Sequence, residues 1–245
     1  MTILDEIVSR LATRPPYGGP DLSGLARRSL EAAIRSRQMG AVIAEFKRRS
    51  PSRGEIAPQG DPAATARSYA RRGAVAISVL TEPHYFGGSP ADLAAAREAS
   101  GLPVLRKDFL LEEADVDESV AMGADAVLLI VRTVGERLGD LLRLAAARGL
   151  ETLVEVHDEE ELALALGAKA SLIGINNRDL ASMTTDLDVS RRLLPLVRGR
   201  ALTVSESGIS RRAEIEELSR LGADAFLIGE SLLLATADVL GEEGR

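Results

Sequence analysis

Short apolar runs alternate with amphipathic stretches along most of the chain. Runs rich in Val, Ile and Leu, which are typical of strands, occur at 41–46, 74–80, 103–106, 125–131, 151–156, 170–175, 201–205 and 224–228. Their starts are roughly 19–33 residues apart, the size of one strand–helix unit. Near-continuous apolar runs indicate parallel strands that are covered on both faces. Eight such units predict an α/β fold, a single closed (β/α)8 barrel of the TIM type rather than an open sheet.

Helix signals separate these runs. Asp61-Pro62, Ser89-Pro90, Asp158 with Glu161, and Ser210 read as helix starts. A tetrad Gly-Ala-x-Ala recurs between an amphipathic stretch and an apolar run at 73–76, 123–126, 167–170 and 222–225. In each copy we expect the glycine to end a helix in the left-handed conformation before the chain enters a buried strand. Recurrence at every second unit favours a barrel built from repeated pieces.

The first 40 residues stand outside this repeat. Helices are expected at Ile3–Leu11 and Leu25–Ile34, joined by a linker rich in Pro and Gly. We expect one domain over 1–245, with an N-terminal helical extension (1–40) and a barrel (41–240). The extension is expected to close the lower end of the barrel or to pack on its side; a contribution to the mouth is the alternative.

Composition narrows the possible functions. The chain has 245 residues, a hydrophobic content of 45%, no Cys and a net charge of −7. The acidic balance argues against nucleic-acid binding. No signal peptide and no apolar run of membrane-spanning length are recognisable. We therefore expect a cytoplasmic protein without membrane or nucleic-acid partners, as a monomer or weak homo-oligomer.

Lysine is scarce, since only three of the 30 basic residues are Lys. Two of them, Lys47 and Lys107, follow apolar runs at the ends of predicted strands, whereas Lys169 lies in a Gly-Ala-x-Ala link, where a solvated structural role is expected. Barrel active sites lie at the carboxyl ends of the strands. An amine, unlike a guanidinium, can be tuned for proton transfer.

Carboxylates accompany the two lysines at the predicted strand ends. Strand periodicity places Glu45 on the same side as Lys47, with Phe46 on the other side. Glu155 and Glu206 end two further strands. Amines and carboxylates that converge on an apolar mouth shift one another's pKa values, which suits acid–base catalysis. For each of these residues taken alone, the alternative to a catalytic role is an ordinary ion pair at the rim of the barrel.

A second signal concerns phosphate. Ser207-Gly208 and Gly229-Glu230-Ser231 follow the seventh and eighth predicted strands, where barrels bind phosphate through backbone N–H groups and a helix N-terminus. Ser50, in the long loop after the first strand, could add a hydroxyl and close over a ligand, or that loop could be solvated. His84 and His157 show no spacing typical of metal ligands and are taken as non-catalytic.

The sequence resembles the indole-3-glycerol-phosphate synthase family. The motifs that carry the resemblance span about 42–240 in order and are IAEFKRRSPSRG (43–54), LTEPHYFGGS (80–89), KDF (107–109), LVEVH (153–157), GINNRDL (174–180), SESGI (205–209) and FLIGE (226–230). This resemblance implies conversion of 1-(2-carboxyphenylamino)-1-deoxyribulose 5-phosphate to indole-3-glycerol phosphate, with release of CO2 and water. It implies no cofactor and no metal.

Residue roles follow from the same resemblance. Lys107 matches the general acid of ring closure, and Glu155 matches the carboxylate that transfers protons during dehydration. Lys47 matches the lysine at the substrate carboxylate, which is also a second acid in some proposals, and Glu45 its orienting partner. The other matches are polar groups that hold the ring or the hydroxyls (Asn176, Glu206), a further substrate contact (Ser207), a phosphate cradle (Ser50, Gly208, Gly229, Glu230) and an apolar pocket for the anthranilate ring (Phe86, Phe109, Leu128). Arg178 and Ile228 are also expected to bind the substrate.

Departures and alternatives remain. The N-terminal helices cannot be aligned with those of the family. Arg106 stands where the family usually has an apolar or small residue, and it should face away from Lys107.

The alternatives are another phosphate-binding barrel of the pathway, such as a phosphoribosylanthranilate isomerase or a tryptophan synthase α chain, or a non-catalytic barrel that binds a phosphometabolite. The first two lack the Glu-x-Lys and Lys-Asp-Phe pairs, and an intact acid–base set argues against the third.

Overall fold

The fold is taken from a computed structural model that describes residues 3–11, 14, 16–37, 39–179, 182–234 and 239–240. The rest of the expected extension and the remainder of the chain's end lie outside that part. No helix among the described residues has the length and apolarity that a membrane crossing requires.

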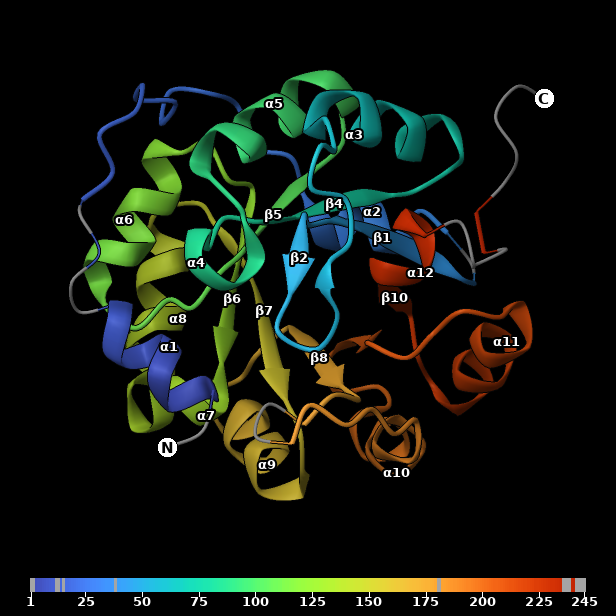
Figure 1. The fold of residues 1–245 in the computed structure, drawn as a ribbon. Helices are drawn as coiled ribbons and strands as arrows, with labels where there is room; N and C mark the ends of the chain where they lie inside the picture. The colour runs from blue at the N-terminus through green and yellow to red at the C-terminus, as the bar shows by residue number, and fades with distance from the viewer. Residues whose placement is uncertain are drawn as a thin grey trace.

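Eight parallel strands form a closed barrel, which confirms the predicted fold (Figure 1). The strands are β1 (Ala41–Phe46), β4 (Ala76–Leu80), β5 (Val104–Lys107), β6 (Ala126–Ile130), β7 (Glu151–Val156), β8 (Leu172–Asn176), β9 (Leu202–Glu206) and β10 (Ala225–Ile228). Each pairs with its neighbours in chain order, and β10 closes on β1. All eight lie within two residues of the predicted runs, because an apolar run this short between helix signals fits only a buried parallel strand.

Helices surround this barrel (Figure 1). The longer ones are α3 (Pro62–Arg71), α5 (Pro90–Ser100), α6 (Glu113–Ala121), α8 (Leu138–Ala147), α9 (Glu159–Gly167), α10 (Asp188–Val197) and α11 (Arg212–Leu221). The short ones are α4 (Pro83–Phe86), α7 (Val131–Val134), the 3-10 helix η1 (Gly135–Arg137) and α12 (Glu230–Leu233). The side chains of Asp61, Ser89 and Asp158 cap their helices as predicted.

Period-2 alternation divides the strand side chains between two cores. In β1, Val42 and Phe46 pack outward against the helices, whereas Ala41 and Ile43 belong to the cluster inside the barrel. Glu45 continues the inward set towards the mouth. The loop after β1 contains a two-stranded hairpin, β2 (Arg49–Ser50) with β3 (Gly54–Glu55), which lies in front of the barrel in Figure 1.

Within the barrel, two helix boundaries differ from the sequence prediction. Gly167 is still helical in α9, and Lys169 adopts the left-handed conformation with φ 62°. This third tetrad is out of register, because β8 begins at Leu172 rather than at the tetrad's last Ala, so Lys169 takes the place that glycine has in the other copies. Ser210 does not cap α11; Arg211 precedes the helix, and Glu214 accepts the backbone N–H groups of Ser210 and Arg211.

The two helices of the extension go to opposite ends of the barrel. α1 (Ile3–Leu11) was predicted with the same bounds. α2 covers Leu30–Arg35, shorter than predicted, because the side chain of Ser29 caps it and the segment before it is bound to the barrel: Arg28 N–H donates to Asp125. α2 closes the lower end, as Glu31 N–H donates to Glu151 at the start of β7. α1 lies at the opposite end, where its Leu4 and Ile7 line the cavity at the carboxyl ends of the strands.

Candidate active site

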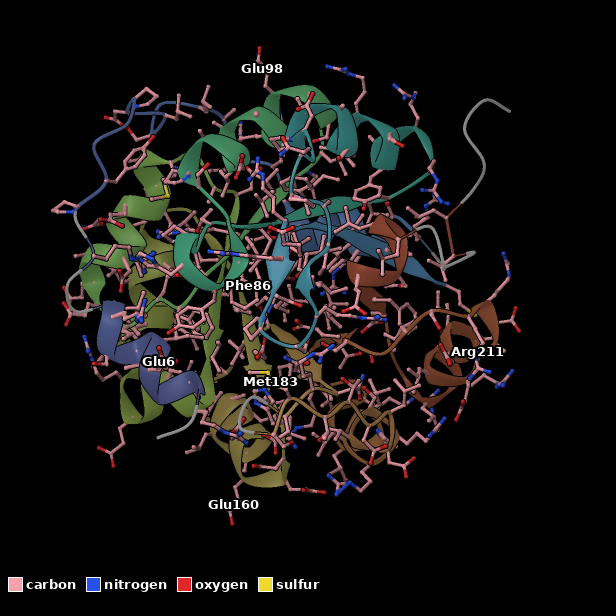
Figure 2. The ribbon with its side chains drawn as sticks, in the orientation of Figure 1. Glu6, Phe86, Glu98, Glu160, Met183 and Arg211 are labelled. Atoms are coloured by element: carbon pink, nitrogen blue, oxygen red, sulfur yellow. The ribbon has the colours of Figure 1, made fainter. Side chains whose placement is uncertain are left out.

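A cavity of 460 Å³ opens at the carboxyl ends of the strands, within the size range of small-molecule sites. Every site residue predicted from the sequence lines it: Glu45, Lys47, Ser50, Phe86, Lys107, Phe109, Leu128, Glu155, Asn176, Arg178, Glu206, Ser207, Gly208, Ile228, Gly229 and Glu230. Phe86 and Met183, another lining residue, lie near the middle of the view in Figure 2, while Glu98, Glu160 and Arg211 lie at the rim.

Lys47 and Glu45 form the first charged pair. Lys47 Nζ donates to Glu45 Oε1 at 2.7 Å, and both side chains are largely buried. Gly229 leaves the room that Glu45 needs, since a Cβ at this position would come within 2.5 Å of Glu45 Oε1. A glycine predicted only for phosphate binding therefore also shapes the acid–base cluster.

Lys107 lies at the centre of the acid–base cluster, which consists of Glu45, Lys47, Lys107, Glu155 and Glu206. Its Nζ donates to Glu155 Oε2 at 2.9 Å and lies 3.4 Å from Glu206 Oε2. Burial lowers the pKa of Lys107, but the negative charges of Glu155, Glu206 and Glu45 outweigh it and raise this pKa above its ordinary value. The lysine thus carries a proton at neutral pH.

The two carboxylates beside Lys107 differ in proton affinity. Burial raises the pKa of Glu155, but Lys107, the close contact with His157 and a hydrogen bond from Asn176 hold it below its usual range. Burial together with the neighbouring carboxylates raises the pKa of Glu206 to about 7, against the pull of Lys107. Environments that push two carboxyl pKa values apart separate an ionised group from one that can hold a proton.

Space and backbone support around these carboxylates come from β8. Gly174 has no side chain to collide with Glu206, since a Cβ there would overlap Glu206 Oε1. Asn176 Nδ2 donates to Glu155 Oε1 at 3.1 Å, and its Oδ1 accepts the N–H of Arg178. The Arg178 guanidinium donates to the carbonyl of Met183, which ties the loop after β8 to the cavity.

Apolar side chains form one wall. Phe86 and Phe109 pack with ring centroids 6.3 Å apart, and Leu128 and Ile228 line the same cavity. Leu4 and Ile7 of α1 also line it, which the sequence prediction missed. The amphipathic pattern of 3–11 indicated a helix with a buried face but did not say which surface it covers.

The loops after β9 and β10 meet at the other side of the cavity. Ser207 and Gly208 are left-handed, with φ 65° and 81°. For a serine this conformation is strained and is typical of functional sites. Ser50, on the hairpin, is buried at the cavity edge, and Arg53 of the same hairpin donates to Glu230 at 2.7 Å. The hairpin is thus joined to the start of α12, an arrangement that suits a phosphate group.

A buried network behind Lys107 fixes the end of β5. Arg106 is fully buried and faces away from the cavity towards α6, as predicted, and its guanidinium lies 3.1 Å from Asp108. Asp108 also accepts hydrogen bonds from Thr81 and, at 2.6 Å, from Arg14 of the extension. No group of three or more potential metal ligands is found among the described residues.

Fold and cavity together define a phosphate-binding (β/α)8-barrel enzyme that works by acid–base chemistry. A family model described as "Indole-3-glycerol phosphate synthase" matches residues 21–240. The chain belongs to this family, the carboxy-lyases that make indole-3-glycerol phosphate in tryptophan biosynthesis.

Curated relatives of that name agree over most of their length. The protein of Desulfosudis oleivorans is 53% identical over 79% of this chain and 74% of its own. The protein of Syntrophobacter fumaroxidans is 50% identical to this chain over 87% of this chain and 82% of its own length. The protein of Halobacterium salinarum is 45% identical over 85% of this chain and 83% of its own length.

Solved structures share the fold at low identity. An N-acetylmannosamine-6-phosphate 2-epimerase from Clostridium perfringens superposes with a TM-score of 0.64 at 16% identity, covering 85% of this chain and 93% of its own. A thiamine phosphate pyrophosphorylase from Pyrococcus furiosus gives a TM-score of 0.57 at 16% identity, with 80% and 87% covered. At this identity the likeness concerns the barrel alone.

Proposed function

We propose that this cavity closes the indole ring of 1-(2-carboxyphenylamino)-1-deoxyribulose 5-phosphate, with Lys107 as the central acid. The observation that carries the assignment is the position of Lys107 Nζ between Glu155 and Glu206, 2.9 and 3.4 Å away. The raised pKa of this lysine supplies a protonated donor at neutral pH. In ring closure the carboxylate-bearing ring carbon attacks the ketone, and Lys107 gives its proton to the ketone oxygen.

The next steps release CO2 and water. Lys47 binds the substrate carboxylate until it leaves as CO2, and Glu45 holds Lys47 in place at 2.7 Å. Dehydration needs an acid for the departing hydroxyl and a base for a ring proton. Glu155, ionised and touching Lys107, accepts the ring proton, while Lys47 gives a proton to the departing hydroxyl, which leaves as water.

The remaining cavity residues bind rather than react. Asn176, Glu206, Arg178 and Ser207 orient the ring and the hydroxyl groups. The anthranilate ring lies against the apolar wall of Phe86, Phe109, Leu128 and Ile228, and the phosphate against Ser50, Gly208, Gly229 and the N–H of Glu230. We further propose that residues 1–245 work as one domain, as a monomer or weak homo-oligomer, without a nucleic-acid partner.

Product formation can be followed directly. The chain contains no Trp, so indole fluorescence that develops with the substrate reports product without background. Turnover by purified protein at neutral pH is expected. Folded protein that binds the substrate but produces no fluorescence would instead support a phosphometabolite-binding barrel, and turnover of phosphoribosylanthranilate would support the isomerase alternative.

A further inference from the structure

His157 lies directly behind Glu155. It follows β7, two residues after Glu155 and on the same side of the chain. Its Nε2 is 3.3 Å from Glu155 Oε1, the oxygen turned away from Lys107. The His157 side chain is 5% exposed, and this residue is not among those that line the cavity. It therefore touches the proton-transfer carboxylate without reaching the substrate.

Glu161 of α9 holds the other side of the imidazole. Its Oε2 lies 2.9 Å from His157 Nδ1 and also accepts the His157 backbone N–H. Its Oε1 accepts from Arg132, which follows β6 in α7, at 2.7 Å, and the same guanidinium is 3.6 Å from Asp158. Because Arg132 occupies Oε1, Oε2 is left for His157. The imidazole is thus placed between two buried carboxylates.

This arrangement favours the charged imidazole. Burial alone lowers the pKa of His157, but the close contacts and negative charges of Glu155 and Glu161 outweigh it and raise the pKa to about 9. Within the described residues, His157 Nε2 is a buried atom without a hydrogen bond of good geometry, so its approach to Glu155 is an ion-pair contact that can tighten. An unpaired buried charge is costly, and Glu155 removes that cost.

We propose that His157 is a positioning residue that stays protonated behind Glu155, fixes Oε1 and leaves Oε2 for Lys107 and the reacting substrate. Three groups hold the carboxylate in this scheme: His157 and Asn176 at Oε1, and Lys107 at Oε2. The inference rests on the proposed proton-transfer role of Glu155.

The charge state of His157 can be measured by NMR, without an activity assay. The chain has two histidines, and the second, His84, has an exposed side chain outside the cavity. In the NMR spectrum of His-labelled protein, with signals assigned through His84→Gln, the His157 ring is expected to remain charged at neutral pH and to titrate near pH 9. In Glu161→Gln it should titrate at lower pH. A His157 ring that is neutral at pH 7 in the folded wild type would overturn the inference.

Kinetics test the positioning role. In His157→Gln the amide can still meet Oε1, but the positive charge is gone, so kcat should fall about tenfold while KM stays unchanged. Loss of that charge raises the pKa of Glu155, so the acid limb of kcat moves to higher pH. Wild-type kcat should fall as His157 deprotonates near pH 9, and the variant should lack this step. His84→Gln serves as the matched control.

The proposed roles of Glu155 and of His157 can be overturned separately. A Glu155→Gln enzyme with wild-type turnover would overturn the role of Glu155, whatever the NMR result. An inactive Glu155→Gln combined with a His157→Gln enzyme of wild-type kcat and pH profile would overturn the role of His157 alone. If His157→Gln does not fold, Glu161→Gln takes its place in the kinetics, because it weakens the same charge from the far side.

Discussion

The two ends of the barrel use the same kinds of charged side chains in opposite ways. At the lower end, Asp125 is buried and its two oxygens accept from the backbone of Arg28 and Val104 and from the guanidinium of Arg97. At the mouth, three carboxylates crowd around Lys107, and Glu206 Oε1 is buried without a hydrogen-bond partner among the residues that the structure describes.

The difference separates stability from chemistry. A carboxylate fully paired with donors stabilises the fold, whereas like charges forced together in an apolar site hold unusual protonation states at a cost to stability. In (β/α)8 barrels, catalytic side chains that destabilise the fold lie at the carboxyl ends of the strands, where the active site is. Substitutions at the mouth should therefore change turnover, and those at the lower end should change unfolding.

The largest expected effect is that of Lys107→Arg. The guanidinium keeps the positive charge between Glu155 and Glu206 but does not release its proton near neutrality. We expect kcat to fall by roughly 10³-fold, within the range of a lost general acid. Indole fluorescence measures it. Lys169→Arg is the matched control, because Lys169 is exposed and outside the cavity. Near-normal turnover of Lys107→Arg would reduce Lys107 to an electrostatic anchor.

Asp125→Asn tests the lower end. Arg97 would keep its buried charge without its partner, and removal of one member of a buried ion pair costs about 3–5 kcal/mol of unfolding free energy. Urea unfolding should show this loss while kcat of the folded protein stays at the wild-type value. A fall in kcat without a fall in stability would contradict the division between the two ends.

The sequence predicted which residues line the cavity but could not rank its carboxylates. The ends of the predicted strands placed Glu45, Glu155 and Glu206 at the mouth, and strand periodicity put Glu45 on the same side as Lys47. That Glu155 is ionised and Glu206 has a pKa near 7 depends on neighbours from other strands and helices, which no spacing along the chain reveals.

The same limit applies to the extension. A helix over 3–11 follows from its apolar pattern, but its position at the mouth follows from contacts of Leu4 and Ile7 with residues far along the chain. Lys169 shows a further limit. It takes a left-handed position that glycine holds in the other tetrads, because the register of that copy is set by the start of β8 rather than by the motif.

Glu206→Gln should stabilise the protein at high pH. The pKa of Glu206 is raised in the fold, so its contribution to stability is present below the ordinary carboxyl pKa and is lost as the pH rises through about 7. Gln stays neutral and avoids this loss. Relative to the variant, the wild type should lose roughly 2–4 kcal/mol of unfolding free energy between pH 4 and pH 8. Parallel pH dependence of the two proteins in urea unfolding would contradict the raised pKa.

The smallest expected effect is that of Gly229→Ala. The backbone at Gly229 has a negative φ of −124°, outside the left-handed region that favours glycine, so the expected effect comes chiefly from the added methyl group. That methyl would meet Glu45 at its carboxylate and its Cβ, and the carboxylate must turn away from Lys47. We expect kcat to fall about tenfold, equivalent to about 1.4 kcal/mol of transition-state stabilisation.

A helical glycine provides the control for this substitution. Gly139 lies in α8, where an added Cβ meets only Arg143 Nη1, at 3.5 Å. Gly139→Ala should leave kcat unchanged and raise the unfolding free energy by about 0.5–1 kcal/mol, because glycine is the more flexible residue in the unfolded chain. Equal kcat for Gly229→Ala and Gly139→Ala would mean that the Glu45–Lys47 pair tolerates displacement. The short contact between Lys47 and Glu45 would then be an ordinary ion pair at the rim of the barrel, and Lys107 would act as the acid without the help of this pair.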